Sequence, residues 1–322
     1  MSGGEVLVGT SGWNYPPSGY GSWNGIFYPL KQGQKIPGTT AKFDELAYYA
    51  ERFRTVEINN TFYRPPAAKT STSWAQRTPA GFEFSLKLYR LFTHERRVAP
   101  ADVDEFRRGV DPLANAGKLG AILCQFPASF QRDARAVDYV NALLHMFSAY
   151  SLAVELRHRS WSDAFGETIS LLNEHGAAFV QIDEPKFRTS IRQNQLPNIT
   201  SFYYLRLHGR NVAKWWRHEH KDERYDYLYT STEVREFSET VGAVRELVPK
   251  SYTYLNNHPN ARAVVNAVQL RSMLGELLDP RDYPSLMAHY PDLADVLPSV
   301  DADTFRLVAP EPIGVDRSTR RK

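Results

Sequence analysis

Charged and imidazole side chains stand at or near the ends of several short apolar runs in this sequence. In AVELRHRSW (153–161), for example, Glu155 and Arg157 alternate with Val154 and Leu156. The carboxylates and imidazoles could transfer protons as general acids and bases, and the lysine and arginine cations could bind an anion. We predict that the catalytic residues come from five such runs. Lys87, Asp183 and His208 lie at the run ends, and Glu57 and Glu155 lie about one layer deeper.

Each residue of this set has an expected task. Glu155 and Asp183 would act in acid–base chemistry or bind a metal, and His208 would transfer a proton or act as a ligand. Lys87 would help to hold a substrate anion, and could form a Schiff base if its cationic neighbours lowered its pKa. Further substrate-binding candidates lie on or after the apolar runs: Asn59, Tyr63, Arg64, His94, Gln125, Arg157, His158, Trp161, Arg206, Asn256 and Asn257.

Eight apolar runs of strand length would position these side chains, at 6–11, 55–60, 82–88, 120–126, 152–157, 178–183, 202–209 and 252–257. Segments with helical spacing separate most of them, at 39–53, 102–117, 136–147, 167–176 and 231–247, and another follows the last run at 260–278. The alternation predicts a parallel sheet covered by helices, and eight units favour a closed (β/α)8 TIM barrel. An open doubly wound sheet is weaker, because no run is followed by a G-x-G-x-x-G turn. We expect an irregular crossover at 184–201, a barrel domain over 1–280 and a C-terminal extension, a packed or partly disordered tail, over 281–322.

Alternate side chains of a strand point to opposite faces, so each run should split into a helix-facing and an interior set. The predicted helix-facing set is apolar: Val56, Ile58, Phe82, Phe84, Leu86, Leu88, Val154, Leu156, Val180, Ile182, Leu205 and Leu207. The predicted interior set is polar: Glu57, Asn59, Glu83, Ser85, Lys87, Gln125, Glu155, Arg157, Gln181, Asp183, Arg206, His208 and Asn256. Active sites of TIM barrels lie at the C-terminal mouth, so a ring of such groups predicts a ligand pocket there. The alternative is a structural layer in which Glu57, Glu155 and Asp183 are neutralised by Lys87, Arg157 and Arg206.

Several motifs resemble the YecE-like family, domain-of-unknown-function family 72. They are VGTSGWNY, WNGIFYP, TVEINNTFYRPP, WAQRTPAGFEFSLKLYRLFTH, LGAILCQFPASF, AVELRHRSW, YLRLHG and YLNNHPNARAVVNA, in order from about residue 6 to residue 270. The resemblance implies a TIM barrel and leaves the activity open. Two segments depart from it, the extension after residue 280 and the charged insert WWRHEHKDERYDYLY at 215–229.

Composition bounds the functional classes. The single cysteine, Cys124, excludes an internal disulfide and a multi-cysteine metal site, and its apolar neighbours predict that it is buried. A divalent metal remains an alternative cofactor, although cations in the same ring disfavour it. The formal charge of +3 permits anionic partners without requiring nucleic acid. We expect a cytoplasmic protein, since no signal peptide or membrane span is evident.

These observations predict an enzyme that acts on an anionic substrate, which would be a phosphorylated compound, a nucleotide or a nucleic acid, by acid–base or metal-assisted chemistry. The competing prediction is a non-catalytic nucleotide or nucleic-acid binding module, suggested by arginine and aromatic residues in the loops after the predicted strands. A glycoside hydrolase is a weaker alternative, because the cations favour an anion over a neutral sugar. A nucleophilic hydrolase is set aside, because G-x-S-x-G is lacking.

Overall fold

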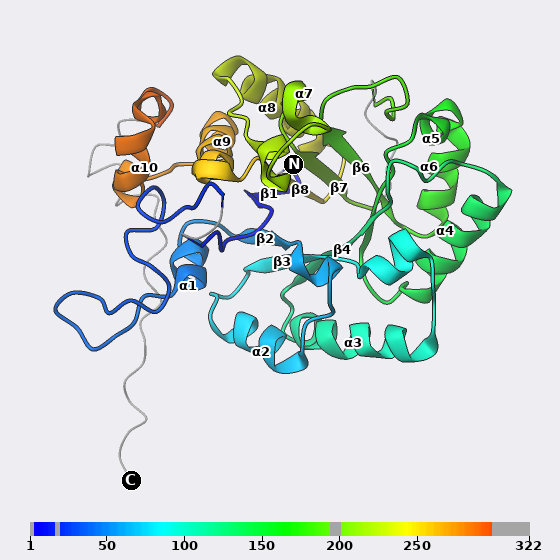
Figure 1. The fold of residues 1–322 in the computed structure, drawn as a ribbon, viewed down its shortest axis with the longest axis horizontal. Helices are drawn as coiled ribbons and strands as arrows, with labels where there is room; N and C mark the ends of the chain where they lie inside the picture. Colours follow the sequence, from blue (N-terminus) through cyan, green and yellow to red (C-terminus); the bar gives the residue numbers. More distant parts are fainter. Residues whose placement is uncertain (1–2, 17–19, 194–200, 298–322) are drawn as a thin grey trace, which may run out of the picture.

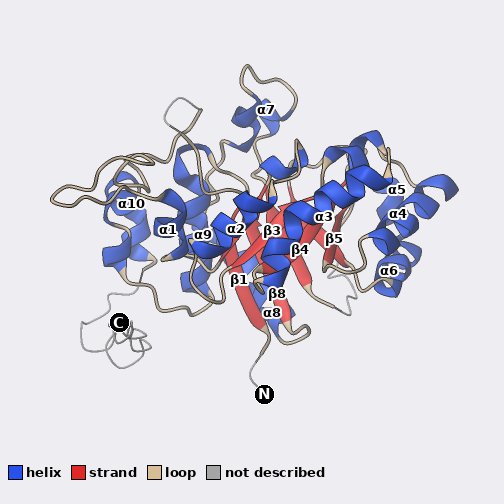
Figure 2. Ribbon diagram, turned by 90° about the horizontal axis from the view of Figure 1, so that it is seen from below, coloured by secondary structure: helices blue, strands red, loops and turns tan. Residues whose placement is uncertain are grey.

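The computed structural model describes residues 3–16, 20–193 and 201–297. Its eight strands are all parallel and close into a barrel in sequence order, with β8 paired to β1. The strands are β1 (Glu5–Thr10), β2 (Thr55–Ile58), β3 (Glu83–Lys87), β4 (Leu119–Gln125), β5 (Leu152–Glu155), β6 (Ala178–Asp183), β7 (Tyr203–Leu207) and β8 (Lys250–Leu255). The predicted (β/α)8 TIM barrel is confirmed, and helices surround the strands in both ribbon views (Figures 1 and 2).

The α-helices are α1 (Glu45–Ala50), α2 (Ala68–Gln76), α3 (Pro100–Asn115), α4 (Ala134–Met146), α5 (Arg159–Asp163), α6 (Phe165–Glu174), α7 (Val212–Trp215), α8 (Ser231–Arg245), α9 (Arg262–Met273) and α10 (Pro284–His289). Short 3-10 turns lie at Asn60–Phe62, Lys221–Tyr225, Pro259–Ala261, Pro280–Asp282 and Pro291–Asp295, with a π-helical turn at Leu91–Glu95. The helix expected over 39–53 is shorter than predicted. It begins after Asp44, whose side chain accepts hydrogen bonds from the backbone N–H groups of Leu46 and Ala47, so aspartate and not threonine caps it.

The predicted inward and outward orientations of the strand side chains are correct where a helix covers the barrel. Val56, Phe84 and Val154 are fully buried on the outer side, and Cys124 is buried as expected. The interior is polar even below the mouth. The Tyr254 hydroxyl lies 2.6 Å from the Thr55 hydroxyl and donates to the Ser85 hydroxyl at 2.9 Å. Tyrosine hydroxyls thus satisfy polar groups in a barrel core that apolar side chains usually fill.

Strand β6 is the exception, and here the predicted orientation is wrong. Its register pairs Ile182 with Arg206 and Asp183 with Leu207. Laterally paired residues of parallel strands face the same side, so Ile182 faces the interior with Arg206, and Asp183 faces outward. A polar outer face is tolerated here because residues 184–193 form no helix over β6, in agreement with the irregular crossover expected for this segment. Residues 194–200 of that crossover lie outside the described residues.

Two segments noted in the sequence have ordered structure in the described part. In the extension, α10 and the following 3-10 turn bury Leu286 and Leu293. Residues 298–322 of the predicted tail lie outside the described residues. The charged insert follows α7, which stands at one end of the barrel (Figure 2). None of the helices in the described ranges combines the length and apolar character that crossing a membrane requires.

Candidate functional site

The deepest polar layer of the mouth is centred on the Arg206 guanidinium. It donates to both carboxylate oxygens of Glu57, at 2.9 Å from Nε and 2.7 Å from Nη2, and to Oε2 of Glu155 at 2.5 Å from Nη1. Glu57 also accepts from the hydroxyls of Tyr204 and Ser11, each at 2.8 Å. This arrangement neutralises most of the Arg206 charge inside the barrel, as the structural alternative expected for part of the ring.

The next layer holds Arg157 and His208. The Arg157 Nε donates to Oε1 of Glu155 at 2.6 Å, and its Nη1 lies 3.3 Å from a carboxylate oxygen of Glu184. Burial alone would raise the pKa of Glu155, but Arg157 and Arg206 hold that pKa well below its usual range. Burial, and then the charge of Arg206, lower the pKa of His208 to about 3, so its imidazole is neutral at physiological pH. Burial raises the pKa of Glu184, the second carboxyl group beside Arg157.

Lys87 ends β3 and differs from the other cations of the ring. Its Nζ donates to the side-chain carbonyl of Gln125 and lies 4.2 Å from the centre of the Phe62 ring. Among the described carboxylates none forms an ion pair with it. Burial, and then the charges of Arg206 and Arg157, lower the pKa of Lys87 to about 7. The mouth therefore contains an amine that exchanges its proton near neutral pH.

These layers form the floor of a cavity of about 370 Å³ at the C-terminal mouth. The predicted residues that line it are Asn59, Tyr63, Lys87, Gln125, Arg157, Arg206, His208 and Asn256. The predicted Glu57 and Glu155 lie directly beneath and contact the lining through Arg206. Asn256 is hydrogen-bonded to Nδ1 of His208 at 2.9 Å, which fixes the imidazole ring.

Several residues of the cavity wall were not predicted as site residues: Ser11, Tyr15, Asn60, Phe62, Lys221, Asp222, Arg224, Tyr225 and His258. His258 stacks on the Tyr15 ring with a centroid distance of 4.5 Å, and its Nε2 lies 3.7 Å from a carboxylate oxygen of Asp222. Asp222 comes from the charged insert, which the sequence analysis noted only as a departure from the family pattern. The insert is dense in charged and aromatic residues and follows strand seven, and this feature of the sequence could have predicted a wall of the site.

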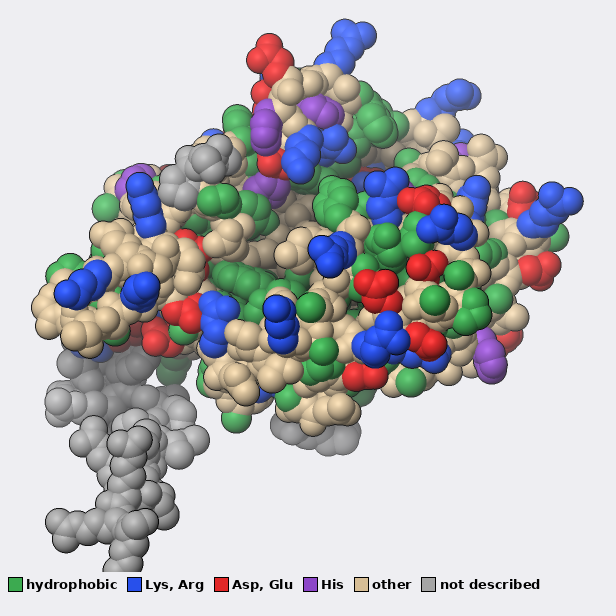
Figure 3. All heavy atoms as spheres, turned by 60° about the horizontal axis from the view of Figure 1, so that its bottom comes forward, with side chains coloured by type: hydrophobic (Ala, Val, Ile, Leu, Met, Phe, Trp, Pro, Cys, Tyr) green, Lys and Arg blue, Asp and Glu red, His purple; other side chains and the backbone are tan. Residues whose placement is uncertain are grey.

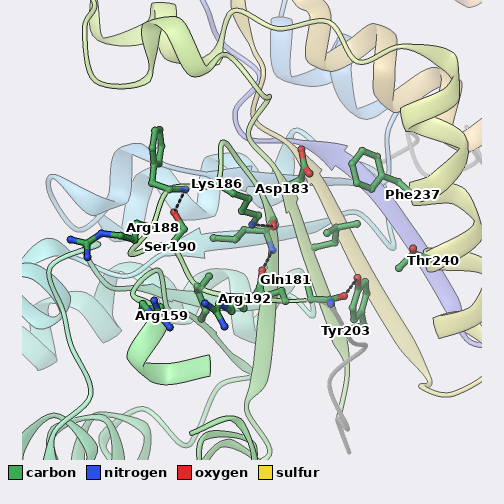
Figure 4. Close-up of a pocket in the computed structure, with 15 residues that line it drawn as sticks. Arg159, Gln181, Asp183, Lys186, Arg188, Ser190, Arg192, Tyr203, Phe237 and Thr240 are labelled. Atoms are coloured by element: carbon green, nitrogen blue, oxygen red, sulfur yellow. Dashed lines mark hydrogen bonds between the residues drawn. The ribbon is translucent and has the colours of Figure 1, made fainter. Parts of the chain in front are cut away.

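Asp183 does not join the ring at the mouth. Its carboxylate accepts from Arg210, at 2.9 Å from Nη2, and from the Tyr229 hydroxyl at 2.8 Å. It borders a second cavity over the outer face of β6 and β7, where Figure 4 shows it with Lys186 and Gln181 among the lining residues. The catalytic prediction for Asp183 at this mouth is therefore corrected: its outward orientation on β6 separates it from the other four residues.

Trp161, His158 and Asn257 also lie outside the mouth cavity. The Trp161 side chain is fully buried under the loop after β4, where its Nε1 donates to the Phe130 carbonyl at 2.9 Å. His158 caps α5 by accepting from the Ser160 N–H at 3.2 Å. Asn257 is buried against Asn266 of α9, to which its amide donates at 2.8 Å. All three position loops and helices around the barrel.

Arg64 and His94 stand near the mouth but do not line its cavity. Arg64 borders a separate depression beside Pro65 and Trp74. His94 packs its ring edge-on against Phe62 at 4.7 Å, and burial lowers its pKa to about 4. A wall residue, Phe62, thus separates the His94 imidazole from the cavity. In the described ranges, no three His, Cys, Asp or Glu side chains are grouped so that they could hold a metal ion.

The profile described as "Protein of unknown function DUF72" matches residues 7–286. The chain belongs to the DUF72 family. It is 25% identical to the UPF0759 protein YunF of Bacillus subtilis (strain 168) over 286 residues, which cover 84% of this chain and 94% of that protein. A DUF72 family crystal structure from Thermotoga maritima MSB8 shares 34% identity and a TM-score of 0.72, covering 84% of this chain and 99% of that one.

A DUF72 family protein of Enterococcus faecalis V583 is similar at 22% identity and a TM-score of 0.71, with 85% of this chain and 97% of that chain covered. These similarities establish the family and the barrel. The DUF72 description names no substrate or reaction, so the chemistry of the mouth has to be argued from its own residues.

Proposed function

We propose that the mouth cavity is the active site of an enzyme that acts on a small anionic substrate by proton transfer. The observation that carries the proposal is Lys87, a cavity-lining amine held by the neutral amide of Gln125, with a pKa of about 7. A group that titrates near the working pH is suited to both accept and donate a proton. Perturbed pKa values of this kind concentrate at functional sites.

The charges of the mouth divide into supporting and ligand-facing groups. The Arg206 guanidinium donates hydrogen bonds to Glu57 and Glu155. It therefore stabilises the floor of the cavity and is not free to bind a ligand. Lys221 and Arg224 line the wall, where their cations add to that of Lys87. An anion that entered would meet these donors in a partly water-excluded site, where charge-assisted hydrogen bonds are strong.

The distribution of charge on the face drawn in Figure 3 gives no support to the nucleic-acid binding module. On the face drawn in Figure 3, Lys and Arg side chains are interspersed with Asp and Glu side chains. A nucleic-acid groove would instead gather lysine and arginine into a continuous basic stripe. The concave, internally charged mouth is better suited to a small ligand.

Thermal unfolding in the presence of small anions tests the proposal. Inorganic phosphate or oxalate at saturation should raise the Tm of the wild-type protein by a few degrees, because a ligand that binds only the folded state stabilises it. Lys87→Met should lose most of that rise. Lys69→Met, which alters an exposed lysine on α2, should keep it.

An equal Tm rise in wild type and Lys87→Met would overturn the proposal. So would salt-dependent binding of an oligonucleotide that Lys87→Met leaves unchanged, because that result supports the binding module.

A further inference from the structure

We propose that Lys87 forms an imine with the carbonyl carbon of an aldehyde or ketone that also carries a carboxylate or phosphate group. This inference rests on the proposed function and names the substrate class of the same cavity. It adds a covalent step that proton transfer alone does not require.

The surroundings of Lys87 distinguish it from other lysines that the structure describes. Lys250 pairs with Glu83 at 2.5 Å and Lys214 with Glu223 at 2.9 Å, so each ammonium has a carboxylate partner. Lys118 donates to two backbone carbonyls, of Ala75 and Thr78. Lys87 instead has the neutral Gln125 carbonyl and the face of Phe62 as neighbours, and it opens into a ligand-sized cavity.

The orientation of Gln125 contributes to this environment. Its Nε2 donates to the Phe126 carbonyl at 3.1 Å, which turns its side-chain oxygen toward Lys87. The amide therefore anchors Nζ without adding the negative charge that would stabilise an ammonium. A carboxylate at this position would hold the amine protonated, and a protonated amine cannot attack a carbonyl.

The two buried arginines act in the same direction. Arg206 and Arg157 each oppose a positive charge on Lys87, after the larger effect of burial, and the carboxylates of Glu155 and Glu57 partly offset the two arginines. With its pKa lowered to about 7, Lys87 presents a free amine at neutral pH far more often than an ordinary lysine does. A lysine desolvated beside other cations is a known way to make an imine-forming nucleophile.

The chemical step balances without an oxidant or a further reactant. The Nζ lone pair attacks the carbonyl carbon, a C–N bond forms, and the carbonyl electron pair moves to oxygen, which is protonated. The nitrogen gives up its two hydrogens, the C–O bond breaks, and the oxygen leaves as water carrying two hydrogens, which gives the neutral imine. One proton taken from solvent then gives the cationic form. This cation can withdraw electrons from an adjacent C–H or C–C bond, while the cations of Arg224 and Lys221 on the wall face the substrate's anionic group.

Reductive trapping of the whole protein tests the step. Glyoxylate is the anionic probe and acetaldehyde the uncharged one, each added with sodium borohydride near pH 7 and followed by peptide mass spectrometry. We expect glyoxylate to label Lys87 at least tenfold faster than the exposed Lys69, and acetaldehyde to show a much smaller preference. Lys87→Arg should abolish the site-specific label and keep a charge at the position.

Gln125→Glu provides a matched test that does not remove the nucleophile. Its carboxylate would pair with Lys87, so trapping at pH 7 should slow several-fold and recover as the pH rises toward 9. A purely structural role of Gln125 would not move the pH profile in this way.

Labelling spread evenly over the exposed lysines, or unchanged in Lys87→Arg, would overturn the imine. If phosphate still raised the Tm in a Lys87-dependent manner, that outcome would leave the proposed anion site standing and remove only the covalent step. Equal labelling of Lys87 by glyoxylate and acetaldehyde would overturn the requirement for an anionic group.

Discussion

At the scale of single residues, the mouth is a set of charges that depend on one another. Glu155 accepts from both Arg157 and Arg206, and its own side chain is fully buried. Removing one partner of such a network would leave an uncompensated buried charge, which is far more costly than losing a surface pair. The two arginines that help to lower the pKa of Lys87 belong to this buried network, which ties the chemistry of the site to the stability of the barrel.

The shifted pKa values predict a loss of stability in acid. The pKa of His208 is about 3 against an ordinary value of 6.5, so between those pH values the unfolded chain binds a proton that the folded chain refuses. Stability should thus fall as the pH drops through this window. Glu155 acts in the same direction below its ordinary pKa of 4.5, because its folded pKa is lowered. We expect His208→Gln to flatten the decline of the urea midpoint between about pH 6.5 and pH 5; an unchanged slope would contradict a buried neutral imidazole.

At the scale of elements, alternation predicted the faces of the strands where helices cover them. In β5 and β7 the charged residues Glu155 and Arg206 point inward as expected, because the apolar alternates pack under helices. On β6 the same rule failed. The apolar Val180 and Ile182 face the barrel interior, and the polar residues face a flank that has no helix over it in the described segment. Sequence alternation records which face is polar, but not whether that face is inside or outside.

The outward position of Asp183 gives a prediction for this element. Asp183→Asn should weaken the interaction with Arg210 and the hydrogen bond from Tyr229, and lower the free energy of unfolding by about 1–3 kcal/mol. It should leave the phosphate-induced rise in Tm intact, because the residue does not line the mouth. Urea unfolding and thermal shift on one preparation check both parts. A selective loss of the phosphate response would contradict the separation of Asp183 from the mouth.

At the scale of the whole molecule, the number of barrel strands and the polar ring could be predicted, whereas several loop residues that complete the wall of the cavity could not. Lys87 ends β3 and Arg157 follows β5, so a strand count places both at one end of the barrel. Ser11, Asp222 and His258 reach the same cavity from the loops after β1, β7 and β8. Their meeting depends on loop conformations and on ring stacking between segments more than 200 residues apart, such as Tyr15 with His258. No local pattern in the sequence encodes these contacts.

Barrel closure yields a last prediction. β1 and β2 share a single paired position, Thr10 with Val56, whereas β1 and β8 share six. The gap is bridged by the Tyr49 hydroxyl, which accepts from the Thr10 N–H at 3.0 Å and donates to the Thr55 carbonyl at 3.1 Å. The neighbouring Gly9 permits this close approach, because a Cβ there would lie 2.3 Å from the Thr55 carbonyl oxygen.

Gly9→Ala should therefore force β1 away from β2 and lower the free energy of unfolding by about 2 kcal/mol or more, measured by equilibrium urea unfolding. Gly242→Ala is the matched control, since a Cβ at that position in α8 meets nothing within 4 Å. That control should gain about 0.5–1 kcal/mol from helix propensity. Because Ser11 follows this strand directly and donates to Glu57, Gly9→Ala should also weaken phosphate binding at the mouth. If the free energy of unfolding of Gly9→Ala equalled that of the wild type, barrel closure would not depend on the close contact between β1 and β2.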